Sequence, residues 1–240
     1  MTSSMTGLAT STSPRCDVLR REALTPRDRD EMFALLGTYF ANVRRDVFDR
    51  DLGEKEWVIL LRDDGGRVDG FSTLMTMNAG GATVFFSGDT IVDRGRWGSA
   101  DLPRTWSRHV FTLAEELRTR EAYWFLISSG FRTYRYLPLF FRDFYPAAGR
   151  ATPPAMKALL DRIARAKFGD SYDAETGVVR LATPAPLRAG VSDPDARAAR
   201  DPHVAFFLEA NSGHGMGDEL ACLVRIDRDN LTPAGRRMLR

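Results

Sequence analysis

Cysteine and histidine are scarce in this sequence. It holds two cysteines, Cys16 and Cys222, and three histidines, all far apart in the chain. Structural zinc sites need four such ligands at short, regular spacings, and disulfide-rich folds need several cysteine pairs. The pattern therefore predicts no metal site and no disulfide. We expect Cys16 to be a free thiol and Cys222, which lies in an apolar run, to be a buried small side chain.

Long apolar runs and charge of one sign are also missing. No stretch approaches the ~20 apolar residues that cross a bilayer, and the Ser- and Thr-rich start lacks the basic and apolar regions of a secretion signal. The chain has 34 basic and 32 acidic residues, and like charges do not cluster in blocks. These absences argue against a membrane or nucleic-acid partner. They predict a cytoplasmic protein whose residues 1–15 form a disordered leader.

The overall amino-acid composition is typical of a globular protein. Hydrophobic residues make up 43% and charged residues 28% of 240 residues, which is enough apolar material for one large core. We expect a single domain over residues 16–240, with an elaborated C-terminal part at about 150–240.

Turn residues and apolar spacing divide the first half into elements. Thr25 and Pro26 are typical of a helix start, and apolar residues follow at helical spacing up to Val43. A second short helix ends near Gly53. Turns at 63–66 and 80–81 separate three extended segments, which predict an antiparallel meander over 56–61, 67–77 and 82–92. A helix over 102–118 leads to the apolar segment 122–129, typical of a strand buried on both faces.

The second half is less regular. An aromatic-rich helix is expected over 134–144, and an amphipathic helix from Thr152 onward. Residues 183–202 form a long irregular connection. The apolar runs 203–209 and 220–226 predict two further strands, and the tail after Asp227 predicts a short helix or a frayed end.

With a first strand at 17–21, this succession resembles the GNAT (Gcn5-related N-acetyltransferase) fold. The resemblance covers residues 16–147 and, with fewer matching features, the last two strands. It implies an α/β (α+β) protein with a mixed, mainly antiparallel central sheet flanked by helices. It also implies an acyltransferase that moves an acyl group from acyl-CoA, or from acyl carrier protein, to a small-molecule amine.

The resemblance further implies where the donor binds. The backbone of the strand at 85–93 would hold the pantetheine arm, and the following loop and helix start the phosphates. The residues implied in donor binding are Arg94, Arg96, Gly98, Ser99 and Ala100. Ser129 and Arg132, at the end of the buried strand, are further candidates for contacts with a pantetheine amide and with a carboxylate or phosphate; the alternative is a helix cap made by Ser129 or Thr133. The sequence departs from the family where Gly95 replaces the usual Gln or Arg. Asp101 and Pro103 equally suit a capped helix entered through a flexible loop, so both interpretations stay open.

Four residues are candidates for acid–base chemistry. Asp89 lies beside Gly88 in an otherwise apolar strand and is our first choice for general base; the alternative is a structural acid paired with an arginine. His214, in the glycine-rich loop 211–219, is a second candidate, although a surface histidine is the more common case. The family's proton-donating tyrosine is replaced by Phe140. Tyr134 and Tyr136 are the possible substitutes, or else tyrosines at the wet edge of a helix.

Two further interpretations remain. Arg44, Phe48 and Trp57 faintly resemble the Arg-x-x-x-Phe and Trp pattern of acyl-homoserine-lactone synthases, which share the fold and take acyl chains from acyl carrier protein. Alternatively, the imperfect phosphate loop and the missing tyrosine indicate a catalytically degenerate GNAT-like protein that binds a ligand or partner.

Overall fold

One mixed sheet of nine strands runs through residues 15–118, 121–191 and 193–240, the part of the chain that this computed structural model describes. The expected leader lies outside the described residues, apart from Arg15. The strand order is β1-β2-β3-β4-β5-β9-β8-β7, and β6 also pairs with β9. The strands are β1 (Arg15–Arg20), β2 (Trp57–Arg62), β3 (Val68–Ala79), β4 (Ala82–Val92), β5 (Ala122–Ser128), β6 (Phe144–Tyr145), β7 (Tyr172–Asp173), β8 (Val178–Val179) and β9 (Glu219–Arg225).

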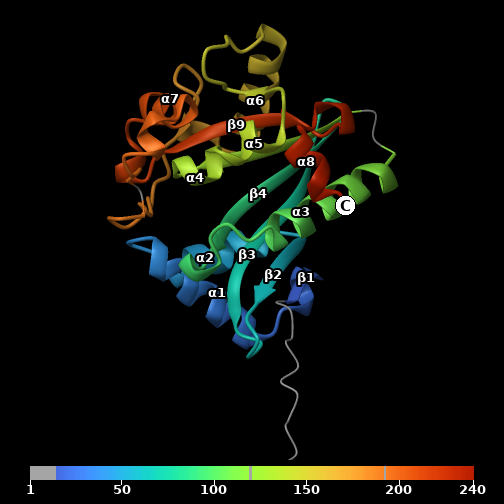
Figure 1. Cartoon of the computed structure of the whole chain (residues 1–240), viewed down its shortest axis with the longest axis vertical. Helices are drawn as coiled ribbons and strands as arrows, with labels where there is room; N and C mark the ends of the chain where they lie inside the picture. Colours follow the sequence, from blue (N-terminus) through green and yellow to red (C-terminus); the bar gives the residue numbers. More distant parts are fainter. Residues whose placement is uncertain (1–14, 119–120, 192) are drawn as a thin grey trace, which may run out of the picture.

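Helices cover both faces of this sheet, as expected. The α-helices are α1 (Pro26–Tyr39), α2 (Arg45–Gly53), α3 (Asp101–Glu116), α4 (Phe131–Tyr134), α5 (Tyr136–Phe140), α6 (Pro154–Phe168), α7 (Pro202–Ala210) and α8 (Pro233–Met238). On one face α3, α4, α5 and α7 share a core with β5 and β9. On the other face α1 and α2 pack on the β1–β4 half and α6 packs on the β5–β9 half. Figure 1 shows α6 and α7 near β9, at the opposite end of the molecule from α1 and α2.

The N-terminal half forms as its turn chemistry predicts. Thr25 caps α1 in a capping box, in which its hydroxyl accepts from the Asp28 amide at 3.1 Å and its own amide donates to the Asp28 carboxylate at 3.0 Å. Gly80 and Gly81 both have positive φ and close the β3–β4 hairpin. Strands β1 to β4 pair antiparallel throughout, so the expected meander is confirmed.

The segment expected as the central strand is β5, and it lies inside the sheet. It pairs parallel with β4 and antiparallel with β9. A parallel neighbour requires a crossover connection, and α3 supplies it. Most β5 side chains are buried, which accounts for the nearly continuous apolar sequence.

Two predictions about the second half are wrong. Residues 203–209 form α7 and not a strand. Asp201 caps that helix by accepting from the His203 amide at 2.9 Å, and Pro202 stands at its first position, so a helix start outweighs the short apolar run. The aromatic helix expected over 134–144 is two short helices, α4 and α5, which end at Phe140. Phe144 instead pairs with β9 as part of β6.

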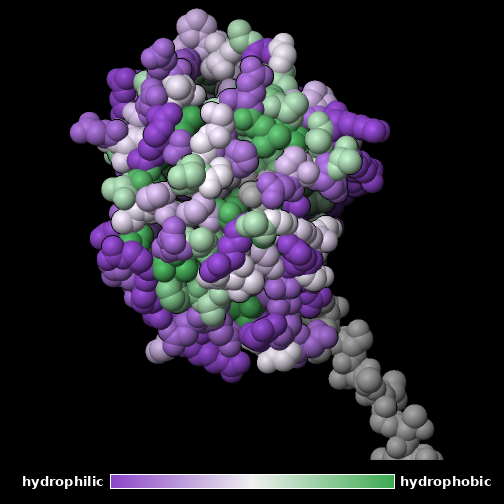
Figure 2. All heavy atoms as spheres, turned by 90° about the vertical axis from the view of Figure 1, so that its left-hand side faces the viewer, coloured by the Kyte–Doolittle hydropathy of each residue, from purple (hydrophilic) through white to green (hydrophobic). Residues whose placement is uncertain are grey.

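The surface carries no dominant apolar face in the view of Figure 2, where polar and charged residues surround small apolar groups. Within the described ranges, none of the helices has the length and apolar character that crossing a membrane demands.

Candidate active site

The sheet opens where β4 and β5 diverge. Their parallel pairing runs from Thr83 opposite Ala122 to Ser87 opposite Leu126, and then stops. The last part of β5 pairs only with β9, and β4 continues beside β3 alone. A bulge accompanies the opening, because Gly88 and Asp89 together stand opposite the single residue Thr73. The backbone of β4 beyond Ser87 therefore has no β5 partner and is available to a ligand.

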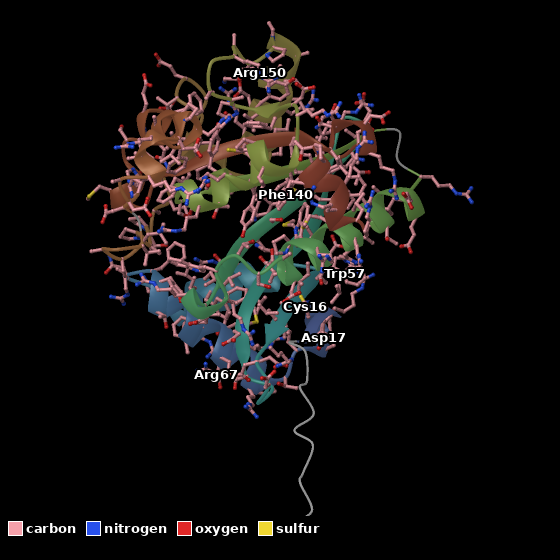
Figure 3. All side chains as sticks on the ribbon, in the orientation of Figure 1. Cys16, Asp17, Trp57, Arg67, Phe140 and Arg150 are labelled. Atoms are coloured by element: carbon pink, nitrogen blue, oxygen red, sulfur yellow. The ribbon has the colours of Figure 1, made fainter. Side chains whose placement is uncertain are left out.

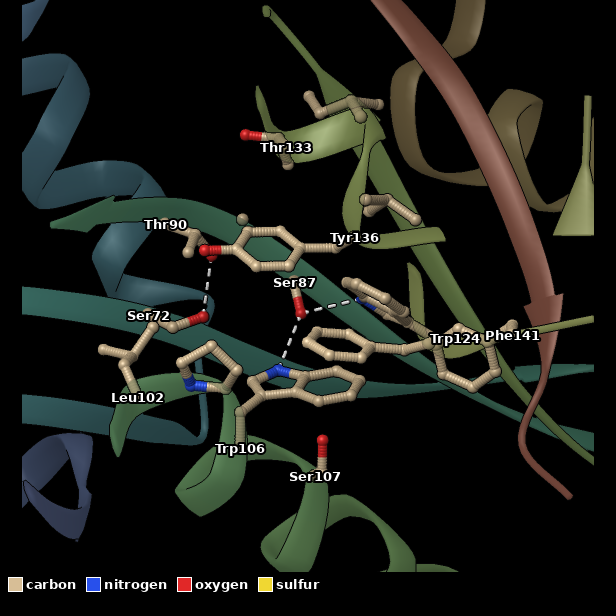
Figure 4. A pocket seen from close by; sticks show the side chains of 15 residues that line it. Ser72, Ser87, Thr90, Leu102, Trp106, Ser107, Trp124, Thr133, Tyr136 and Phe141 are labelled. Carbon is tan, nitrogen blue, oxygen red and sulfur yellow. Dashed lines mark hydrogen bonds between the residues drawn. The ribbon is translucent and has the colours of Figure 1, made fainter. Parts of the chain in front are cut away.

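A cavity of about 50 Å³ lies at this opening (Figure 4). Most of its lining is apolar or aromatic. The lining residues come from β3, β4, α3, β5, α4, α5 and the residue that follows α5. They include Ser72, Gly88, Thr90, Leu102, Trp106, Trp124, Ile127, Tyr136, Phe140 and Phe141. Ile127 packs against the α6 side, whereas Trp106 packs on the α3 side. The opening thus reaches residues of both faces of the sheet.

Two tryptophans hold the vertex of the opening, which is Ser87, the last β4 residue that pairs with β5. The indole N–H groups of Trp106 and Trp124 both donate to the Ser87 hydroxyl, each at 3.0 Å. Their rings lie 4.4 Å apart between centroids. One buried oxygen thereby satisfies two indole donors that would otherwise be unpaired, which explains a serine inside an apolar strand.

Of the two tyrosine candidates, only Tyr136 reaches the cavity. Its ring stacks on Phe140 and its hydroxyl points toward Thr90 (Figure 4). Burial raises the pKa of Tyr136 above its usual 10. Tyr134 is fully buried, donates to the Pro146 carbonyl at 3.0 Å, and packs among Phe144, Phe206 and Phe207. The structure therefore separates a cavity tyrosine from a core tyrosine.

Asp89 belongs to a group of charged side chains on the α2 and α6 side of the sheet. Lys55, with no exposed surface, donates to the Asp51 carboxylate at 2.6 Å. A Cβ on Gly88 would meet the Lys55 side chain at 2.7 Å. Glu219, the first residue of β9, hydrogen-bonds Ser129 and interacts electrostatically with Asp89 and Asp51. Among the described residues, no Lys or Arg forms an ion pair with Asp89 or Glu219.

Desolvation changes the acidity of both carboxyls. Burial, aided by repulsion from Asp51 and opposed by attraction to Lys55, raises the pKa of Asp89 to about 7. Burial and repulsion from Asp89 and Asp51, opposed by the Ser129 hydrogen bond, raise the pKa of Glu219 to about 8. A carboxyl with its pKa near neutrality is suited to accept and release protons at physiological pH.

The predicted donor loop is only partly arranged for phosphates. Arg94 and Arg132 lie at 5.0 and 4.5 Å from the Trp97 ring. Arg94 donates to the Gly190 carbonyl at 3.2 Å, and Arg132 donates to the Val191 carbonyl. These two arginines therefore come together. Arg96 lies apart from them, because it pairs with Asp69 at 3.1 Å.

The start of α3 offers few free donors. Ala100 is the N-cap without a side-chain cap, and Gly98 has a φ of 93° that suits the turn. Ser99 accepts from the Asp101 amide at 3.2 Å and donates to the Asp101 carboxylate at 2.7 Å. Pro103 has no N–H, and the Asp101 carboxylate repels an anion at this terminus.

The remaining candidates lie elsewhere or are held by the backbone. His214 lies in a short turn after α7, with Nδ1 3.0 Å from the Asn211 carbonyl. Of the lactone-synthase pattern, Arg44 is exposed and pairs with Asp46, and Phe48 is core. Trp57 stands opposite Arg20 in the β1–β2 pair, with the Arg20 guanidinium over its ring, and Figure 3 shows it apart from Phe140. Phe48 and Trp57 thus serve packing in different parts of the molecule.

Sequence reasoning missed Lys55 and Glu219 in the charged group, and Ser87, Trp106 and Trp124 at the vertex. An acidic residue at the start of an apolar run was the only visible signal for Glu219. Within the described ranges, no group of three or more histidine, cysteine, aspartate or glutamate side chains is arranged to hold a metal ion.

No family model matches the sequence, and no curated protein does. Solved structures do. Several of the similar structures are named as acetyltransferases. One is a GNAT family N-acetyltransferase from Escherichia coli in complex with CoA, with 17% identity and a TM-score of 0.37 over 50% of this chain and 66% of that one. Another is an acetyltransferase from Trypanosoma brucei, with 18% identity and a TM-score of 0.40 over 59% of this chain and all of that one.

A third similar structure is N-acetylglutamate synthase from Neisseria gonorrhoeae, complexed with coenzyme A and N-acetyl-glutamate. It has 12% identity and a TM-score of 0.40 over 90% of this chain and 36% of that one. The predicted mixed, mainly antiparallel sheet flanked by helices is confirmed by the topology of this chain itself. At these identities and scores the likeness gives no argument about substrate or activity, which depend on the site itself.

Proposed function

We propose that this protein is a cytoplasmic N-acyltransferase, which moves an acyl group from acyl-CoA or a carrier-bound phosphopantetheine to a small-molecule amine. One observation carries the proposal. At the β4–β5 divergence, a cavity with a tyrosine hydroxyl adjoins one face of the sheet, and a desolvated aspartate stands on the bulge of the other. A thioester in the opening would therefore have a proton acceptor on one side and a proton donor on the other.

The residues support a single-displacement reaction. Asp89 accepts a proton from the acceptor ammonium, and the neutral nitrogen attacks the thioester carbon. The C–N bond forms, the C–S bond breaks, and the departing thiolate takes a proton from the Tyr136 hydroxyl. The acylated nitrogen loses its second proton, which solvent carries to the Tyr136 phenolate. Solvent also removes the proton from Asp89, so each turnover releases one proton. The unpaired β4 backbone beyond Ser87 positions the pantetheine amides.

The donor must displace some present contacts. A cavity of about 50 Å³ is smaller than a pantetheine arm, so the Tyr136 and Phe140 rings must move outward on binding. Arg94 and Arg132 are the phosphate contacts that fit best, because both lie beside Trp97 at the end of β4 and the start of α4. Arg96 contributes less, since Asp69 already pairs with it.

A catalytically degenerate binding protein is the second candidate. The observation that favours it is the start of α3, where Asp101 and Pro103 weaken an anion site. An enzyme and a binding protein differ in what they do with a thioester, so product formation decides between them.

The test combines donor binding with turnover. Thermal shifts are measured with CoA, dephospho-CoA, phosphopantetheine and acyl carrier protein, and acetyl-CoA is then incubated with a mixture of amines while free thiol is assayed. We expect stabilisation by at least one pantetheine donor and amine-dependent thiol release. Stabilisation without thiol release favours the binding protein, and no response to any donor refutes both the acyl transfer and the donor site.

A further inference from the structure

The charged group behind the β4–β5 opening has an excess of carboxylates. Asp51 comes from α2, Asp89 from the β4 bulge and Glu219 from the start of β9. The Lys55 ammonium, bonded at 2.6 Å to the Asp51 carboxylate and at 3.2 Å to the Asp51 carbonyl, balances one of them. Asp89 and Glu219 are left without an ion-pair partner among the described residues.

Strand alternation places these two carboxylates on one face. Along β9, Leu220 and Cys222 belong to the α3-side core, whereas Ala221 and Leu223 belong to the α6-side core. Glu219 therefore faces the α6 side. Gly88 faces Lys55 on that same side, and the bulge keeps the adjacent Asp89 there, within electrostatic reach of Glu219.

The neighbouring cations are already engaged elsewhere. Lys167 pairs with Glu54, and Arg180 pairs with Asp173 at 3.0 Å and with Asp218 at 3.2 Å. Among the described residues, Lys55 pairs with Asp51 and also attracts Asp89, so a single ammonium faces three carboxylates and the group keeps an excess of two. Asp89 and Glu219 are half-buried, and desolvated carboxylates in excess of the available cations are costly, so a cationic ligand would remove that cost.

A second observation points to a ligand at the same place. The Thr73 hydroxyl is 1% exposed and has no hydrogen-bond partner. It lies 2.8 Å from the position that a Cβ on Gly88 would occupy, next to the Lys55 side chain. A buried hydroxyl normally has a partner. An ammonium carries several N–H donors, so one that binds the Asp89 carboxylate can also donate to this hydroxyl.

We infer that the acceptor is an aliphatic diamine, whose reacting amine binds Asp89 and Thr73 and whose second ammonium binds Glu219. This inference rests on the proposed acyl transfer. An excess of two carboxylates over the single Lys55 ammonium matches two ammonium groups, whereas a monoamine leaves one carboxylate uncompensated and an amino acid adds a further negative charge. The two carboxylates stand on strands separated by β5, so ordinary strand spacing gives roughly 10 Å as the minimum distance, and the divergence of β4 from β5 beyond Ser87 adds to it. A four-carbon diamine with an ion pair at each end covers about that span.

The chemistry follows the charges. The ammonium at Asp89 gives up two protons, one to Asp89 before the attack and one as the amide forms, while the ammonium at Glu219 keeps its protons. The product is a monoacylated diamine with a single positive charge. It has lost one of the two ion pairs, so its affinity is lower than that of the substrate and it leaves the site.

The experiment compares three acceptors of equal length with acetyl-CoA, or with whichever thioester proves active. They are 1,4-diaminobutane, butylamine and 4-aminobutyrate, which differ only in the charge at the far end. We expect kcat/KM for the diamine to exceed that for butylamine at least tenfold, and butylamine to exceed 4-aminobutyrate at least tenfold. Glu219→Gln should bring the diamine down to the level of butylamine, and Glu209→Gln, at an exposed position on α7, should change neither. Equal rates for all three acceptors would overturn the inference.

Two further measurements keep the result unambiguous. Glu219→Asp keeps the charge but shortens the side chain, so it should shift the preference from 1,4-diaminobutane toward 1,5-diaminopentane; an unchanged preference counts against the Glu219 contact. Calorimetric titration of 1,4-diaminobutane without donor reports the cation site alone. Binding without acylation would refute the acyl transfer and support the site, whereas acylation of butylamine without diamine binding would refute the site and support the transfer.

Discussion

Replacing Asp89 by Asn should lower activity and raise stability together. Asn keeps the size of the side chain but cannot accept a proton, so kcat/KM should fall by roughly 10²–10⁴-fold, the usual contribution of a general base. The stability change follows from desolvation. Burial raises the pKa of Asp89 from 3.8 to about 7, so ionising it at pH 8 costs the folded state about 4 kcal/mol, at ~1.4 kcal/mol for each tenfold change in proton affinity.

The variant recovers only part of that cost. The amide that replaces the Asp89 carboxylate is also partly desolvated, and repulsion from Glu219 is shared between the two groups. We expect the unfolding free energy to rise by about 1–3 kcal/mol at pH 8. A raised pKa gives stability that is present below pH 4 and lost as the pH climbs through 7, so wild type and variant should be alike near pH 4.

Urea titrations at pH 4 and pH 8, together with steady-state kinetics, test both expectations. Arg44→Gln, at an exposed surface pair with Asp46, serves as a control that should alter neither quantity. A variant that is less stable at pH 8 would mean that Asp89 has a structural partner. A variant with full activity would exclude Asp89 as the base.

Three further predictions concern the same site. The kcat/KM of the wild type should rise with pH and level off above about 8. The reason is that the interacting carboxyls of Asp89 and Glu219 must lose protons with pKa values of about 7 and 8. A flat profile between pH 6 and 8.5 contradicts this expectation. Tyr136→Phe should lower kcat by roughly 10–100-fold and leave the melting temperature unchanged. Tyr134→Phe should leave kcat unchanged and lower the unfolding free energy by about 1–2 kcal/mol, because it removes a buried hydrogen bond. Equal kinetic effects of the two substitutions would remove the distinction between them. Gly88→Ala should lower stability by about 1–3 kcal/mol and activity at least tenfold, since the new methyl would stand 2.7 Å from the buried lysine side chain; a variant with wild-type melting and turnover would show that the bulge is not tightly packed.

The sequence was informative where chemistry is local. Turn residues predicted the meander, Thr25 and Pro26 predicted the start of α1, and the contrast of Asp89 with its apolar strand singled out the position where the β4 bulge lies. These signals lie within a few residues of the feature they specify. The segment 203–209 misled because its apolar composition suits a strand, while the decisive residues, Asp201 and Pro202, stand just before it.

The rest of the site depends on pairing between distant segments. Glu219 meets Asp89 only because β9 pairs with β5, and nothing near Glu219 in the sequence specifies that neighbour. The burial of Lys55 has the same origin, since Gly88 leaves the space that its side chain fills. Ser87 likewise gains its role from two tryptophans on different elements.

The position of β9 in the chain also bears on how the protein is made. Strands β1 to β5 all lie before residue 129 and can pair as they leave the ribosome, but the second partner of β5 is the segment Glu219–Arg225. Until that segment emerges, β5 has an open edge along its entire length, and an open apolar edge invites pairing with other chains. The acidic pair is also incomplete during that interval. Slow translation or truncation before residue 219 should therefore favour aggregation, and it leaves no partially active intermediate.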